Sequence, residues 1–296
     1  MATILGIDHK IIAASTLGLT AGAAAISAYL CYRQSASRKK QNIYETEKSL
    51  SEYLVFHYAA PKEILKYEHG PWSSVDFPRR CAELCMEYFE AKEGVPNTAL
   101  DIGCAVGRSS FELARSFNRV IGSDYSQSFI DACNHLKQGG KLEYKMLEEG
   151  ELYTNHVASV PSGIETDRLT FQQGDACRLP LDIGHFGCVL AANLICRLHT
   201  PVDFLNRLSS LVSPGGIAVI TSPYTFLEEY TPRRHWIGSY TDANGKRVTG
   251  FDGLKRHLGK DFDLIGEKDM PFFIRETARK NQWTVAHATV WRRKVD

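Results

Sequence analysis

The sequence lacks several patterns that would assign it to a class directly. None of its 8 cysteines forms a Cys-x-x-Cys pair and no histidine cluster accompanies them, which argues against a zinc ribbon or a thioredoxin-like site. We therefore expect no bound metal. An excess of one charge is also missing, because 35 Lys and Arg balance 34 Asp and Glu. Without a net positive field, a role in coating nucleic acid is disfavoured.

The remaining composition is that of an ordinary enzyme. The chain has 296 residues, of which 44% are hydrophobic and 23% are charged. That is enough apolar material for a sizeable core, in one large domain or two small ones. Several cysteines stand in apolar runs, which favours a reducing compartment over a secreted disulfide framework.

The N-terminal 42 residues differ from the rest. Residues 11–32 are uncharged and four cations follow them within eight positions. A helix of about 20 apolar residues spans a bilayer, and flanking positive charge faces the cytosol. We predict that 1–42 hold a membrane anchor (11–32) with a basic linker, and that the globular domain, 43–296, faces the cytosol. A cleaved targeting segment, or a soluble helix on a cytoplasmic protein, is the alternative.

The start of the globular domain, residues 43–95, predicts a helical cap. Residues 43–58 and 77–89 have apolar side chains at helical spacing. The stretch 60–76 between them predicts mostly loop, because it carries two prolines and a glycine.

From residue 98 onward, short apolar strands alternate with helices. The strands are predicted at 98–102, 119–122, 169–171, 186–192 and 216–221, and the helices at 108–117, from Ser126 onward, and at 202–212. This alternation predicts an α/β fold with a doubly wound, mostly parallel sheet covered on both faces. Strand-like patterns recur at 262–265 and 284–291.

Four polar residues stand where these strands end: Asp101, Asp124, Asp175 and Asn193. The carboxyl ends of parallel strands share one edge of the sheet, and ligands bind beyond that edge. A single Asp at such a place is usually a turn or helix-cap residue. Four of them at successive strand ends predict a shared ligand crevice.

The turn after the first strand fits neither common phosphate-binding pattern. A G-x-G-x-x-G motif would need glycines where Ala105 and Arg108 stand, and no P-loop is present. The sequence reads Asp101-x-Gly103-x-Ala105-x-Gly107 instead. This pattern resembles motif I of the class I S-adenosylmethionine-dependent methyltransferases, with Ala in place of the middle glycine.

The resemblance implies S-adenosyl-L-methionine as cofactor and a Rossmann-like, seven-stranded sheet whose last strand is antiparallel, with 269–282 connecting the last two strands. Asp124 is placed to accept hydrogen bonds from both ribose hydroxyls. By the resemblance, Asp175 would accept from the adenine amino group, with Ala176 beside the ring. The predicted cofactor-binding residues are Asp101, Gly103, Cys104, Ala105, Gly107, Asp124, Tyr125, Asp175, Ala176 and Asn193.

Stretches outside the cofactor motifs are similar to one narrower family. They include Ser222-Pro223-Tyr224, Ile274-Arg275-Glu276-Thr277, 53–58, 173–177, 191–195 and 289–293. Together they resemble the 4-mercaptohistidine (5-thiohistidine) N1-methyltransferases of ovothiol biosynthesis. The resemblance implies methylation of an imidazole nitrogen on a thiolated histidine.

An amino-acid acceptor needs partners for its carboxylate and its ammonium group. Arginine holds a carboxylate in a bidentate fork, and carboxylates hold an ammonium. We predict Tyr224, Glu229, Arg275 and Glu276 as the catalytic, acceptor-binding residues. Ordinary ion pairs between elements are the alternative.

Two questions stay open at this stage. Tyr53, His57 and Tyr58 form either a lid over the cofactor or plain helix packing, and no general base is identifiable. The alternative functions are methylation of another histidine-containing small molecule, peptide or protein, and a cofactor-binding scaffold without turnover. The sequence does not predict the oligomeric state.

Overall fold

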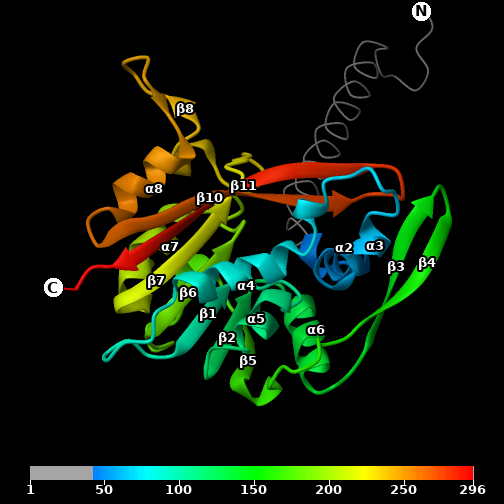
Figure 1. Ribbon diagram of the computed structural model, residues 1–296. Coiled ribbons are helices and arrows are strands. Elements are labelled where there is room, and N and C mark those ends of the chain that lie inside the picture. The colour runs from blue at the N-terminus through cyan, green and yellow to red at the C-terminus, as the bar shows by residue number, and fades with distance from the viewer. Residues whose placement is uncertain (1–42, 296) are drawn as a thin grey trace, which may run out of the picture. The chain divides into compact units, whose positions relative to one another are not determined.

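The computed structural model describes residues 43–295 of the chain, and the described residues from Tyr44 onward form one compact unit (Figure 1). Within 43–295, no helix is long and apolar enough to cross a membrane. The predicted anchor, residues 11–32, lies outside the described residues.

A seven-stranded sheet forms the centre of this unit, in the order β10-β11-β7-β6-β1-β2-β5. The strands are β1 (Thr98–Ile102), β2 (Arg119–Asp124), β5 (Leu169–Gln173), β6 (Phe186–Ala192), β7 (Val212–Ser222), β10 (Phe262–Arg275) and β11 (Asn281–Arg293). Neighbouring strands are parallel except where β11 pairs with β7 and β10. The predicted fold class is therefore confirmed.

Helices cover both faces of the sheet, and each face has its own apolar core (Figure 1). One core includes side chains of α2 (Glu47–Tyr58), α4 (Phe77–Tyr88), α5 (Arg108–Leu113) and α6 (Gln127–Lys137). The other includes those of α7 (Pro201–Leu211) and α8 (Gly250–Leu258). The strands between them are apolar on both sides, as expected for a parallel sheet buried on two faces.

Short elements complete the chain. They are η1 (Ile43–Glu45), α3 (Pro61–Ile64), η2 (Trp72–Ser74), η3 (Thr166–Arg168), η4 (Ala176–Arg178), η5 (Arg233–His235), β8 (Tyr240–Thr241) and β9 (Arg247–Val248). The stretch predicted as loop, 60–76, thus contains two helical turns, α3 and η2. Pro61 suits the first position of α3, and Glu63 accepts a hydrogen bond from the Ala60 amide at 2.8 Å.

Two hairpins differ from the sequence prediction. The polar segment after α6 forms β3 (Leu142–Glu149) and β4 (Leu152–Ala158), because Tyr144 and Met146 of β3 are buried. The predicted connection at 269–282 is wrong, because most of it extends β10 and β11. Phe272 fixes this extension by packing against Phe77 of α4, with ring centroids 4.9 Å apart.

The β10–β11 hairpin projects past the carboxyl edge of the sheet. The last residue of β7, Ser222, lies opposite His287, while β11 begins at Asn281. Six residues of strand correspond to about 20 Å. The hairpin tip therefore stands well away from the ends of the parallel strands.

Candidate active site

The loop after β1 depends on left-handed backbone conformations. Gly103 and Gly107 have φ angles of 74° and 85°, and Ala105 has a φ of 47°. Such a conformation costs a residue with a Cβ about 1–2 kcal/mol. A Cβ on Gly107 would lie 2.8 Å from Cys133 Sγ, so no larger residue fits there. The loop is strained and closely packed, as functional loops often are.

Asp101 lies beneath this loop. It stands inside β1, and only 1% of it is exposed. Its Oδ2 accepts hydrogen bonds from Ser109 Oγ at 2.7 Å and Ser110 Oγ at 2.6 Å, and burial raises its pKa to about 6. The expectation that Asp101 opens into the crevice as a strand tip is wrong, because its side chain holds the start of α5 instead.

Asp124 is the last residue of β2 and joins that strand to the loop. Its Oδ2 accepts from the Ala105 amide and its Oδ1 from the Ser126 amide, both at 2.9 Å. Burial raises the pKa of this carboxyl, although the amide hydrogen bonds oppose the shift. These two amides hold the carboxylate in one orientation. Each oxygen still keeps a lone pair for a further donor.

The neighbouring strand ends carry the other predicted residues. Asp175 follows β5 and its Oδ1 accepts from the Cys177 amide at 2.9 Å, while Ala176 is buried. Asn193 follows β6, and its Oδ1 accepts from Thr221 Oγ1 at 3.0 Å. β6, β1, β2 and β5 are adjacent in the sheet, so these ends share one edge.

Two further residues of the predicted set differ in exposure. Cys104 is buried within the loop, and its thiol donates to the Ala105 carbonyl at 3.7 Å. Tyr125 follows Asp124 and is 62% exposed, so one face of an aromatic ring is open beside the carboxylate.

Helix α2 covers the loop. Tyr58 Oη donates to the Val106 carbonyl at 2.8 Å, and Arg108 Nη1 donates to the His57 carbonyl at 3.1 Å. The ring of Tyr53 packs on Phe129 of α6 with centroids 4.7 Å apart. These contacts tie α2 directly to the loop and to α6.

His57 is a buried histidine of this helix. Its Nδ1 has no hydrogen-bond partner among residues 43–295. Burial, aided by the Arg108 cation, lowers its pKa to about 3. The imidazole is therefore neutral at physiological pH.

The sequence prediction missed three residues whose side chains interact at this edge of the sheet: Arg197, Tyr230 and Tyr44. The Arg197 guanidinium lies 4.7 Å from the centroid of the Tyr230 ring. Tyr44 packs edge-on against Tyr53 at 6.0 Å. Burial raises the pKa of Tyr44 to about 12, with further effects from Tyr230, Arg197 and Asp124. The available signal for Arg197 was its place four residues after the predicted strand end at Asn193.

The four predicted acceptor residues do not form one pocket. Tyr224 Oη lies 3.0 Å from His287 Nδ1, beyond the end of β7, and Glu229 lies beside Tyr230. Arg275 lies at the far end of β10, opposite Asn281, about 20 Å further along the hairpin by strand geometry.

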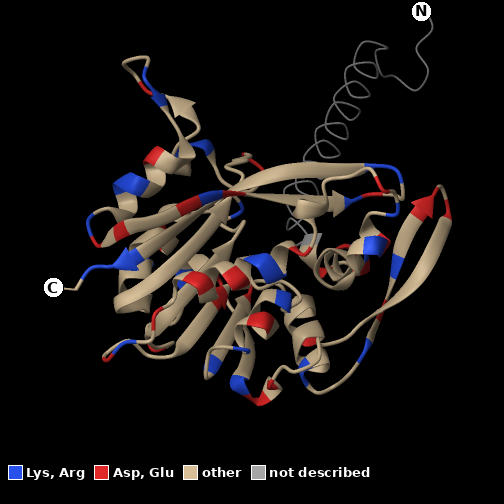
Figure 2. Ribbon diagram, viewed as in Figure 1, with Lys and Arg blue, Asp and Glu red and all other residues tan. Residues whose placement is uncertain are grey.

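At that end, Arg275 and Glu276 make structural contacts. The Arg275 side chain is 2% exposed, and its Nη2 binds Glu148 of β3 at 3.0 Å. Glu276 is paired with Lys280 at 2.6 Å. In the ribbon of Figure 2, blue Lys and Arg positions mark the β10–β11 turn and red Asp and Glu positions mark the β3–β4 turn.

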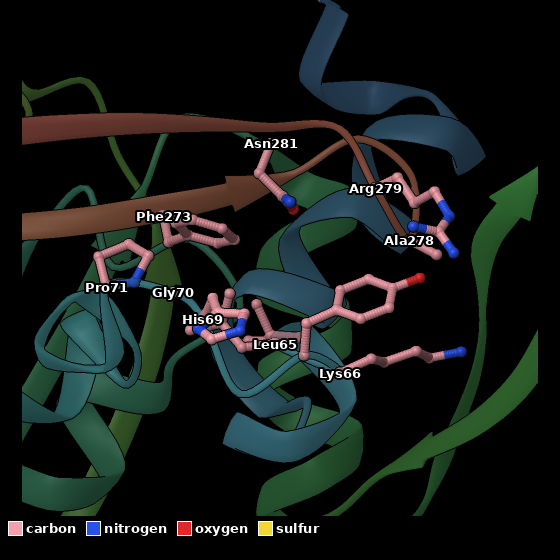
Figure 3. A pocket seen from close by; sticks show the side chains of 11 residues that line it. Leu65, Lys66, His69, Gly70, Pro71, Phe273, Ala278, Arg279 and Asn281 are labelled. Atoms are coloured by element: carbon pink, nitrogen blue, oxygen red, sulfur yellow. The ribbon is translucent and has the colours of Figure 1, made fainter.

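A cavity of about 200 Å³ lies between the segment after α3 and the β10–β11 hairpin (Figure 3). Leu65, Phe273 and Asn281 line it, and Arg279 lies over the Tyr67 ring at 4.8 Å. None of its lining residues belongs to the predicted cofactor set. Among residues 43–295, no group of three or more His, Cys, Asp or Glu side chains is arranged to hold a metal ion.

In comparison with known proteins, residues 100–220 match the family model described as "Methyltransferase domain". An uncharacterized chloroplastic methyltransferase of Arabidopsis thaliana is 23% identical over 199 residues, covering 63% of this chain and 50% of that protein. The mitochondrial ubiquinone biosynthesis O-methyltransferase of Dictyostelium discoideum is 25% identical, covering 59% and 58%. The chain thus spans between half and three fifths of the length of these relatives.

Solved structures show the same fold at low identity. Magnesium protoporphyrin IX methyltransferase from Synechocystis, with bound S-adenosylhomocysteine, has a TM-score of 0.50 and 14% identity, covering 85% of this chain and 97% of that one. The [4+2]-cyclase SpnF has a TM-score of 0.53 and 15% identity, covering 88% and 97%. Since a fold hosts several chemistries, the reaction must be argued from the site.

Proposed function

We propose that this chain is a class I S-adenosylmethionine-dependent methyltransferase and that it transfers a methyl group to a small-molecule acceptor. One observation carries the proposal. Asp124, held by the Ala105 and Ser126 amides, lies at a sheet edge that also presents the strained loop and the ends of β5 and β6. Ligands of doubly wound sheets bind at such an edge.

The residues at this edge suit S-adenosylmethionine. The free lone pairs of the Asp124 carboxylate match the paired hydroxyls of a ribose. The open ring of Tyr125 offers a surface for the adenine, and we retain the second oxygen of Asp175 for its amino group. The backbone of 103–107 would lie against the methionine part, with Asn193 at the other side. When bound, the cofactor supplies an electrophilic methyl group on a sulfonium sulfur.

For the acceptor, we propose an imidazole nitrogen of 5-thiohistidine. The support is the sequence resemblance outside the cofactor motifs, together with a cap rich in aromatic rings above the loop. Tyr44, Tyr53 and His57 are packed there as neutral groups. Such a surface excludes water and can stack an imidazole ring.

The chain's own residues then contribute orientation rather than proton transfer. A neutral imidazole already carries a lone pair on one ring nitrogen, so no base is needed before the N–CH₃ bond forms. The proton on its other nitrogen leaves afterwards to water. Alignment of donor and acceptor is the main contribution expected from the protein.

A labelled-methyl assay tests both levels of the proposal. Purified full-length protein is incubated with methyl-labelled S-adenosylmethionine and 5-thiohistidine, histidine or a histidine-containing dipeptide, and the product is located by NMR. We expect label on a ring nitrogen of 5-thiohistidine. Label in another acceptor would reject the acceptor and keep the reaction class. No binding of S-adenosylhomocysteine by calorimetry would reject the cofactor and the function together.

We also propose that residues 11–32 anchor the protein in a membrane with the catalytic domain on the cytosolic side. The support is the uncharged run followed by basic residues. Full-length protein should stay in the membrane pellet after carbonate extraction, and a chain starting at residue 43 should not. Recovery of the full-length chain in the supernatant would reject the anchor.

A further inference from the structure

Arg197 lies shortly after the end of β6, at the edge of the sheet proposed for the cofactor. It follows β6 in a tight turn, with its amide donating to the Leu194 carbonyl at 2.8 Å. A Cβ added to Gly103 would lie only 2.9 Å from the Leu194 side chain. The turn that carries Arg197 is therefore packed against the cofactor loop itself.

The guanidinium is held in place on one side only. Its Nη1 donates to the Thr225 carbonyl at 2.9 Å and the Cys196 carbonyl at 3.1 Å, and its plane lies near the Tyr230 ring at 4.7 Å. Within residues 43–295, Arg197 forms no ion pair, and its Nε and Nη2 make no hydrogen bond. An anchored cation with a free edge can receive a carboxylate in a bidentate fork.

Aromatic rings pack close to the neighbouring end of β2, at the same edge of the sheet as this cation. Tyr44 packs on Tyr53 and on Phe129 of α6, each at 6.0 Å between centroids. The Tyr44 carbonyl accepts from Ser126 Oγ at 3.2 Å, and the Ser126 amide donates to Asp124 Oδ1 at 2.9 Å, so Tyr44 lies close to the end of β2. Arg197 follows β6 and Asp124 ends β2, on either side of β1 at the same edge of the sheet.

Arg275, the arginine expected from the sequence to hold a carboxylate, has no comparable freedom. Its Nη1 donates to the Leu147 carbonyl at 2.7 Å and its Nη2 to Glu148 at 3.0 Å. Both terminal nitrogens are used inside the protein, and the side chain is buried.

We propose that Arg197 binds the carboxylate of the acceptor and restricts the acceptor class to free amino acids or other small carboxylates. The inference rests on the proposed methyltransferase function and adds a specificity residue to it. A protein-bound histidine lacks a free carboxylate next to its ring, so Arg197 selects against it. Loss of a charge-assisted hydrogen-bonded pair should weaken acceptor binding roughly 10- to 150-fold.

The test compares 5-thiohistidine with its C-terminal methylamide, using wild type, Arg197→Ala and Arg197→Lys. The matched control is Arg233→Ala, because Arg233 also lies over an aromatic ring, Trp236 at 4.6 Å. KM and kcat are measured for each acceptor. Calorimetric titration of each acceptor into protein loaded with S-adenosylhomocysteine gives a readout that needs no turnover.

We expect wild type and Arg233→Ala to prefer 5-thiohistidine over its methylamide by roughly 10- to 150-fold. Arg197→Ala should lose the preference through KM, with kcat and S-adenosylhomocysteine affinity within about threefold, and Arg197→Lys should lie between because it keeps charge without the fork. Equal discrimination by Arg197→Ala and wild type would overturn the inference and leave the methyltransferase function standing. The same holds if wild type uses acid and amide equally. Failure of S-adenosylhomocysteine to bind would overturn the function as well.

Discussion

Replacement of Asp124 by Asn gives the sharpest measure of the cofactor site. The carboxylate accepts one backbone amide on each oxygen, both at 2.9 Å, and it keeps the lone pairs that we assign to the two ribose hydroxyls. Asn is nearly the same size but has one acceptor oxygen and no charge. In the variant, one hydrogen bond from a ribose hydroxyl becomes a bond to a neutral acceptor, and the other hydrogen bond is lost.

The expected loss follows from hydrogen-bond strengths. Bonds to charged groups contribute about 1.5–3 kcal/mol and neutral ones about 0.5–1.5 kcal/mol. Affinity for S-adenosylhomocysteine should therefore fall by about 3–4 kcal/mol, or roughly 160- to 900-fold. The free energy of unfolding should fall by only about 1 kcal/mol, because one amide, of Ala105 or Ser126, loses its acceptor.

Calorimetry with S-adenosylhomocysteine measures the first effect, and urea unfolding measures the second. Asp131→Asn is the matched control, because Asp131 lies on α6 and accepts from Gln127 Nε2 on the same exposed surface. The control should bind as wild type does. A dissociation constant for Asp124→Asn within threefold of wild type, in a protein that unfolds cooperatively, would refute the assignment of Asp124 to the ribose.

Three further variants test the packing around the site. His57→Phe should make stability less sensitive to acid. In wild type, His57 stays neutral in the folded protein, whereas the unfolded chain takes up a proton below the ordinary pKa of about 6.5. Between pH 6.5 and 5, the free energy of unfolding of wild type should therefore fall by up to about 2 kcal/mol relative to the variant. Equal pH slopes in urea unfolding would contradict this. Gly122→Ala should destabilise by about 1–3 kcal/mol, since the new Cβ would lie 2.6 Å from the Phe171 ring; an unchanged melting temperature would show that the ring moves freely. Arg275→Met should cost about 2 kcal/mol, because Glu148 loses a buried partner but keeps Lys66 and Thr154. Wild-type stability of that variant would show that the two hairpins are not held together by this pair.

The sequence by itself determined the elements that depend on local pattern. The apolar runs of β1, β2, β5 and β6 were predicted within two residues, and so were α4 and the start of α6. Left-handed glycines and a carboxylate at a strand end also leave a local mark, which is why the loop and Asp124 were found. Each of these features is set by neighbours within a few residues along the chain.

Tertiary structure alone decided which side chains meet. Asp101 was predicted at the end of a strand, yet its side chain lies beneath the loop, where it accepts hydrogen bonds from Ser109 and Ser110. Arg275 was predicted to bind the acceptor, yet its side chain pairs with Glu148 of the β3–β4 hairpin, 127 residues away along the chain. Pairing over such separations depends on how the sheet and its hairpins pack in space, and local periodicity carries no information about it. For the same reason, Arg197 and Asp124 come to one edge of the sheet only because β6, β1 and β2 are neighbouring parallel strands.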